Sequence, residues 1–94
     1  MQEIFSSESL LEEVTNVTTK DSSRVILFND NIHTFDEVIN QLIKAIGCST
    51  QVAEKFAVEV HTKGKAAVYE GMMTKALIVS HILEEIGLHT QIEI

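Results

Sequence analysis

Apolar and polar residues divide the chain into a polar N-terminal segment and a core with regular apolar spacing. Residues 1–23 are rich in serine, threonine and acidic side chains, with scattered apolar positions. Any helix there would be short, and short isolated helices are marginal in water. We therefore predict a flexible N-terminal extension at residues 1–23 and a single core domain at residues 24–94.

A continuous apolar run opens the core domain. Residues 25–28 read Val-Ile-Leu-Phe, with polar residues on both sides. The length of the run and its β-branched residues favour a strand that is buried on both faces of a sheet. Asn29, Asp30 and Asn31 follow directly. Their short polar side chains are typical of turns, so the pattern predicts a buried strand that ends in a polar turn.

Two amphipathic helices are expected next. Thr34 and Glu37 form a capping-box pattern at the start of the first helix, and Gly47 is its natural stop. The apolar stripe of this helix consists of Phe35, Val38, Ile39, Leu42, Ile43 and Ile46. The second helix begins near Ser49 or Thr50 and ends at residues 61–64. Its apolar face consists of Ala53, Phe56, Ala57 and Val60.

The remaining sequence predicts a strand, a helix and a strand. Residues 66–69 form a short strand that Glu70 and Gly71 end. The third helix runs from Met72 or Met73 to Ile86, with apolar positions at Ala76, Leu77, Val79, Ile82, Leu83 and Ile86. Residues 89–94 alternate as a half-buried strand, with Thr90, Ile92 and Ile94 on one face. The β-α-α-β-α-β order predicts a compact α+β sandwich, in which three helices pack on one face of a three-stranded sheet.

Charge and composition restrict the choice of partners. The chain has 7 basic and 14 acidic residues, and its formal net charge of −7 makes nucleic acid a poor partner. The N-terminal residues lack the basic start and apolar run of a signal peptide. The apolar stretch at residues 76–79 is too short to span a bilayer. Since a single cysteine also excludes an internal disulfide, we expect a cytoplasmic protein without membrane contact.

The common signatures of catalysis and cofactor binding are missing. The four glycines are scattered, so there is no phosphate loop, and no cysteine pair or histidine spacing suits a metal. We predict no catalytic residue, no metal and no cofactor. A small hydrolase that uses Cys48 as a nucleophile remains an alternative, although Cys48 is more simply a small residue in a turn between helices.

The turn after the first strand has two interpretations. Asn29, Asp30 and Asn31 could satisfy loose backbone groups, or they could present acceptors to a cleft. An ammonium group has three donors and no acceptor, so amide, carboxylate and neutral imidazole groups would suit it. His61 could supply the imidazole, or it could simply interact with the dipole at the end of its helix.

Two sequence motifs, which follow each other along the chain, resemble motifs of the ClpS family. The first is residues 25–31 with the helix start at residues 34–39, and the second is residues 60–66, which read V-H-T-K-G-K-A. Residues 87–93 resemble the closing strand of the family, so the similarity covers residues 24–93. ClpS proteins are adaptors that bind substrates beginning with Leu, Phe, Tyr or Trp and deliver them to a Clp AAA+ protease.

The resemblance implies a site and its partners. The α-amino group of the substrate would contact Asn29, Asp30 and His61, with Asn31 and His33 at the edge of the site. The hydrophobic pocket would be formed by Phe35, Val38, Ala57, Val60 and Leu88. The partners would be substrate proteins with such N-terminal residues and the N-terminal domain of a ClpA- or ClpC-type unfoldase that works with ClpP. The adaptor itself would be a monomer, and its N-terminal extension would enter the unfoldase pore.

The chain departs from the family pattern at a few positions. Asn31 stands where an acid is common, Phe35 where many members have methionine, and Ala57 where some have a larger residue. The segment after Lys65 is also shorter, so we assign no protease-docking residues. The alternative function is an interaction module of ribosomal stalk-like fold that does not recognise N-terminal residues.

Overall fold

The computed structural model describes residues 22–94, which form three strands and three helices. The elements are β1 (Ser23–Phe28), α2 (Phe35–Ile46), α3 (Thr50–Lys63), β2 (Lys65–Gly71), α4 (Met73–Glu84) and β3 (Thr90–Glu93). This order is the predicted one. β1 begins at Ser23, one residue before the predicted start of the core domain, and residues 1–21 of the predicted N-terminal extension lie outside the described residues.

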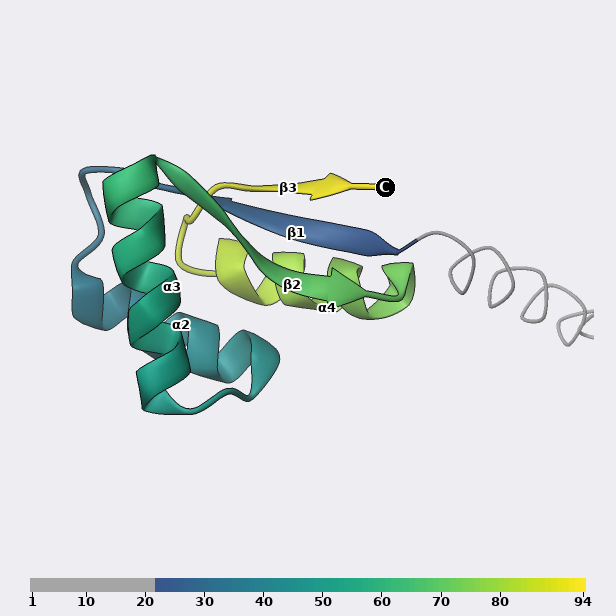
Figure 1. Ribbon diagram of the computed structural model, residues 1–94, viewed down its shortest axis with the longest axis horizontal. Helices are drawn as coiled ribbons and strands as arrows, with labels where there is room; N and C mark the ends of the chain where they lie inside the picture. The colour runs from purple at the N-terminus through teal and green to yellow at the C-terminus, as the bar shows by residue number, and fades with distance from the viewer. Residues whose placement is uncertain (1–21) are drawn as a thin grey trace, which may run out of the picture.

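The sheet has the strand order β2-β1-β3, with antiparallel pairing on both sides of β1 (Figure 1). Because β1 is central, its residues are the most deeply buried part of the sheet. Val25 and Leu27 are fully buried, and Ile26 between them is 6% exposed. The prediction of a strand buried on both faces is confirmed, since alternate residues of a strand point to opposite faces.

A β-bulge interrupts the pairing of β1 with β2. Val25 pairs with Tyr69 and Ile26 with Ala67, so Val68 is the extra residue on β2. Val68 belongs to the buried core and the next residue, Tyr69, packs against that core, because the bulge changes the alternation of β2. A Cβ at Gly71 would overlap the hydroxyl group of Tyr69, so this glycine makes room for the tyrosine ring.

All three helices lie on one face of the sheet, as predicted (Figure 1). α4 packs against all three strands, α3 packs against β2, and α2 packs against both α3 and α4. The buried core therefore lies between the sheet and the helices. Its members include Val25, Leu27, Leu42, Ala53, Val60, Ala76, Val79, Leu83 and Leu88.

The helix ends follow the expected capping chemistry. Thr34 and Glu37 exchange the two hydrogen bonds of a capping box at the start of α2. The Ser49 hydroxyl accepts from the main-chain N–H of Val52 at the start of α3. Gly47 and Gly64 end these two helices in the left-handed conformation. Thr34 and Gly64 cap the two helix ends nearest to the turn after β1, and Gly47 and Ser49 cap the ends at the α2–α3 connection.

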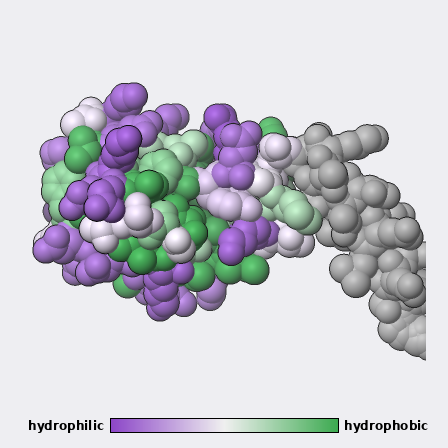
Figure 2. Space-filling model, turned by 60° about the horizontal axis from the view of Figure 1, so that its bottom comes forward, coloured by the Kyte–Doolittle hydropathy of each residue, from purple (hydrophilic) through white to green (hydrophobic). Residues whose placement is uncertain are grey.

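Some predicted boundaries and buried positions in the second half are wrong. β2 continues through Gly71, because Ser23 of β1 extends the pairing to that residue. α4 ends at Glu84 instead of Ile86, with a turn before Gly87. Leu77 is 55% exposed, and Ile86 is also exposed. Apolar surface is accordingly visible among hydrophilic residues on the helical side of the molecule (Figure 2). Ile94, predicted on the buried face of the last strand, lies beyond β3 and is exposed.

Candidate functional site

The end of β1 meets the end of α3 at one side of the sheet. Gly64 follows α3 with φ of 89°, and its N–H donates to the Val60 carbonyl. The carbonyl of Gly64 in turn accepts a 2.9 Å hydrogen bond from the N–H of Asn29. Asn29 is therefore held beside the last turn of α3, which carries His61. Two motifs that are distant in the sequence form one site here.

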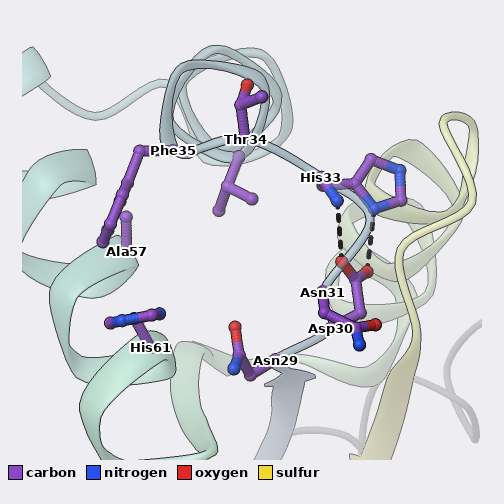
Figure 3. A pocket seen from close by; sticks show the side chains of 9 residues that line it. Asn29, Asp30, Asn31, His33, Thr34, Phe35, Ala57 and His61 are labelled. Atoms are coloured by element: carbon purple, nitrogen blue, oxygen red, sulfur yellow. Dashed lines mark hydrogen bonds and ion pairs between the residues drawn. The ribbon is translucent and has the colours of Figure 1, made fainter.

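A cavity of about 320 Å³ opens between this junction and the start of α2. It is lined by Asn29, Asp30, Asn31, His33, Thr34, Phe35, Val38, Ala57 and His61. Asn29 and His61 border the open space on one side, with Phe35 and Thr34 opposite them (Figure 3). Eight of the ten residues predicted for the site thus line one cavity.

The apolar wall comes from the two helices α2 and α3. Ala57 is buried, Val38 is partly buried, and Phe35 is 45% exposed. The rings of Phe35 and His61 are neighbours at the cavity and lie tilted to each other, with a centroid distance of 5.3 Å and an interplanar angle of 57°. The other two predicted pocket residues, Val60 and Leu88, are buried in the core and do not line the cavity.

The carboxylate of Asp30 forms hydrogen bonds with other residues of its own turn. One carboxylate oxygen accepts hydrogen bonds of 2.9 Å from the N–H groups of Ile32 and His33. The other lies 2.8 Å from Nδ1 of the His33 ring. The N–H of His33, the side chain of His33 and the N–H of Ile32 together hold the pKa of Asp30 below its usual value. A carboxylate has about four lone-pair sites, so about one remains for a ligand.

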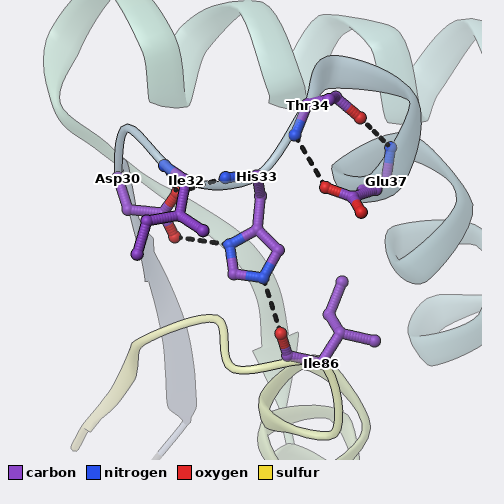
Figure 4. A network of polar contacts seen from close by, with 6 residues as sticks. All are labelled: Asp30, Ile32, His33, Thr34, Glu37 and Ile86. Carbon is purple, nitrogen blue, oxygen red and sulfur yellow. Dashed lines mark hydrogen bonds and ion pairs between the residues drawn. The ribbon is translucent and has the colours of Figure 1, made fainter.

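His33 links this turn to the turn that follows α4. Its ring lies between the carboxylate of Asp30 and the carbonyl oxygen of Ile86, 2.6 Å from Nε2 (Figure 4). The hydrogen bond with Asp30, followed by that with Ile86, raises the pKa of His33 above its usual value of 6.5. The side chain is 11% exposed, so solvent reaches the ring only partly. His33 was predicted only as a residue at the edge of the site.

Sequence reasoning missed Thr34 as a lining residue of the cavity. Its capping role was predicted, and its position directly after the turn of residues 29–31 is a signal that it lies near the same cavity. The bond between His33 and Ile86 had no comparable signal, because 53 positions separate the two residues.

The described residues offer little for metal binding or thiol chemistry in the cavity. Within residues 22–94, no group of three or more His, Cys, Asp or Glu residues could hold a metal ion. Cys48 lies between α2 and α3 and does not line the cavity. The helices of this part of the chain are too short or too polar to cross a membrane. Fold and site together define a small α+β domain with polar acceptors beside an apolar cavity.

Comparison with known proteins identifies the family. The model of the family described as "ATP-dependent Clp protease adaptor protein ClpS" matches residues 18–89, which is more than half of the chain. The chain belongs to the ClpS family of adaptor proteins.

Solved structures and sequence relatives are consistent with this assignment. The structure of Agrobacterium tumefaciens ClpS2 bound to L-phenylalaninamide matches with a TM-score of 0.72 and 19% identity, over 77% of this chain and 94% of that chain. At this identity the match shows a common fold. The E3 ubiquitin-protein ligase UBR2 of Mus musculus is 38% identical over 68 residues, which are 71% of this chain and 4% of the ligase. The Homo sapiens ligase of the same name is 38% identical over 55 residues, so the chain spans only a small part of either relative.

Proposed function

We propose that the cavity binds the first residue of a substrate protein through its free α-amino group and its bulky apolar side chain. The observation that carries this proposal is the composition of one cavity. Asn29 and His61 lie at its polar edge, and Phe35, Val38 and Ala57 form its apolar wall. At about 320 Å³ the cavity is at the small end of the range for ligand sites, which suits one residue.

The polar edge has the chemistry that an ammonium group requires. The side-chain oxygen of Asn29 and an unprotonated ring nitrogen of His61 can each accept a hydrogen bond. The remaining lone pair of Asp30 can add a third, and its charge favours a cation. Acetylation of the substrate would remove the charge and leave these acceptors without donors, so the site would select free N-termini.

The apolar wall selects the side chain of the first residue. Burial contributes roughly 25 cal/mol per Å² of apolar area, which favours Leu, Phe, Tyr and Trp over small residues. Phe35 stands at the rim against His61, where it would screen side chains that branch at Cβ.

Membership of the ClpS family supports a role in delivery. We propose that the protein works as a monomer in the cytoplasm and hands its substrates to the N-terminal domain of a Clp AAA+ unfoldase. ClpA- and ClpC-type unfoldases that work with ClpP are the candidates, and the adaptor needs no catalytic residue for this role.

The binding proposal can be tested with peptides that differ only at their first residue. Fluorescence anisotropy should show binding of Phe-, Leu-, Tyr- and Trp-initiated peptides and much weaker binding of Ala- and Asp-initiated ones. An N-acetylated Phe-initiated peptide should not bind. Equal affinity for Phe- and Ala-initiated peptides would instead favour the stalk-like interaction module.

Two variants connect that selectivity to the cavity. His61→Ala and Asn29→Ala should each weaken binding of the Phe-initiated peptide by about 1–3 kcal/mol, the range for a hydrogen bond to a charged group. His81→Ala is the matched control, because His81 is an exposed histidine of α4 that does not line the cavity. Delivery is tested separately, by degradation of a Phe-initiated reporter by ClpAP or ClpCP with and without the protein.

A further inference from the structure

One side chain ties the turn at the polar side of the cavity to a segment that is distant in the sequence. His33 contacts the Asp30 carboxylate through Nδ1 at 2.8 Å and the Ile86 carbonyl through Nε2 at 2.6 Å (Figure 4). Ile86 lies in the turn that joins α4 to β3. The ring also lies beside Gly87, where an added Cβ would be 3.7 Å from Cε1 of His33.

Both partners of the His33 ring are acceptors. A carbonyl oxygen and an ionised carboxylate cannot donate, so both ring nitrogens must carry a proton. Only the imidazolium form satisfies both contacts. A neutral ring would turn one lone pair toward an oxygen less than 3 Å away, and one of the two contacts would be lost.

The same carboxylate organises the main chain of the cavity wall. Asp30 accepts from the N–H groups of Ile32 and His33 in addition to the ring. The neighbouring residues Asn29, Asn31 and Thr34 line the cavity. One carboxylate therefore connects the His33 ring to the main chain of the turn whose residues line the cavity.

Building on the proposed function, we propose that His33 is a positioning residue, whose protonated ring fastens the turn of residues 29–34 to the turn after α4 and so holds the amine site in its binding geometry. The substrate amine contacts Asn29 and His61, and His33 acts through Asp30. The affinity for N-terminal residues then depends on the charge of a histidine that the ligand does not contact.

The surroundings of His33 set the direction of this dependence. Asp30 of the same turn and Glu37 of α2 are the charged groups that act on it, and the turn after α4 presents the carbonyl of Ile86. These contacts raise the pKa of His33. Its charge is complete below the ordinary histidine value of about 6.5 and is lost as pH rises through the raised pKa. The contribution of His33 to affinity should follow the same course.

The substrate amine also loses its charge at alkaline pH, with an ordinary pKa near 7.7–8.0. That effect is common to the parent protein and to any variant of His33. The ratio of their affinities at each pH therefore isolates the contribution of the histidine.

The experiment compares the full chain with His33→Gln, a neutral residue whose amide can donate to only one of the two acceptors. At pH 6, His33→Gln should bind a Phe-initiated peptide about 3- to 30-fold more weakly than the parent. This difference should shrink as pH rises through the raised pKa of His33. His81→Gln is the control and should match the parent. Parent-like affinity of folded His33→Gln at pH 6, or a loss of equal size at every pH, would overturn the proposal.

A second measurement on the unmodified protein without ligand keeps the test independent of peptide binding and of the folding of the variant. In an NMR pH titration, the His33 ring should remain an imidazolium to a midpoint above about 6.5. The main-chain amide signals of Asn29, Asn31 and Thr34 should shift with that same midpoint. A midpoint at or below 6.5, or amide signals that do not follow it, overturns the positioning role. If no Phe-initiated peptide binds the parent, the proposed function fails, and this titration alone decides whether His33 holds the turn.

Discussion

The main-chain N–H of Asn29 donates a 2.9 Å hydrogen bond to the carbonyl oxygen of Gly64. This bond joins the end of the central strand to the end of α3, and it sets Asn29 beside the turn that carries His61. The Gly64 carbonyl can point toward Asn29 because Gly64 adopts φ of 89°. Residues with a Cβ rarely adopt this conformation. A backbone cap of a helix thus also positions one residue of the proposed binding site.

Replacement of Gly64 by alanine should separate these two roles. Nothing lies within 4 Å of an added Cβ at Gly64 or at Gly47, and both residues are left-handed helix caps. Gly64→Ala and Gly47→Ala should each lower the free energy of unfolding by about 1–2 kcal/mol, as measured by urea denaturation. Only Gly64→Ala should also weaken binding of a Phe-initiated peptide. Equal effects of both variants on binding would mean that the Gly64 carbonyl does not position Asn29.

Removal of the Asp30 carboxylate should weaken both the turn and the amine site. We expect Asp30→Ala to reduce affinity for Phe- and Leu-initiated peptides by about 1–3 kcal/mol, since hydrogen bonds to a charged group are lost. Asp30→Asn keeps an oxygen for the N–H groups of Ile32 and His33 but removes the charge, so it reports on charge alone. Asp36→Ala, at an exposed acid in the first turn of α2, is the control. Unchanged anisotropy titrations for Asp30→Ala, with an intact circular dichroism spectrum, would contradict the assignment.

Phe35 should control which side chains enter the cavity. Phe35→Ala removes the ring that lies 5.3 Å from His61, and we expect it to raise the relative affinity for Ile- and Val-initiated peptides. The stability cost should be small, because Phe35 is already 45% exposed. Val52→Ala, at an exposed apolar residue of α3 outside the cavity, should leave the preference order unchanged. The same order of Leu, Phe, Ile and Val peptides in Phe35→Ala would show that the ring has no gating role.

The Asp30–His33 pair should give the free energy of unfolding a specific pH dependence. The pKa of His33 is raised in the folded state, so its contribution is complete below about pH 6.5 and is lost as pH rises through the raised value. The pKa of Asp30 is lowered, so its contribution is present above 3.8 and is lost as pH falls through the lowered value. Urea denaturation should therefore show the largest difference between the parent and His33→Gln between these limits. A difference that instead grows toward alkaline pH would contradict the assignment of a charged His33.

Local features of this protein follow from the sequence alone. The capping box of Thr34 and Glu37 and the glycine caps at Gly47 and Gly64 depend on residues a few positions apart, so spacing is sufficient to predict them. The apolar run of β1 likewise identifies a buried central strand by its composition. The turn of residues 29–31 and His61 could be proposed as a site because the two motifs are each short and contiguous.

Other features were decided only when distant segments came together. β2 reaches Gly71 because Ser23 pairs with it, and Leu77 is exposed because only one side of α4 faces the sheet. Val60 packs into the core while Ala57, one turn earlier on the same helix, borders the cavity. The pKa of His33 is raised first by Asp30 and then by the Ile86 carbonyl, which is 53 positions away in the sequence. Periodicity along a chain specifies which residues share a face, but the tertiary packing determines what that face meets and hence which of its residues are buried, exposed or charged.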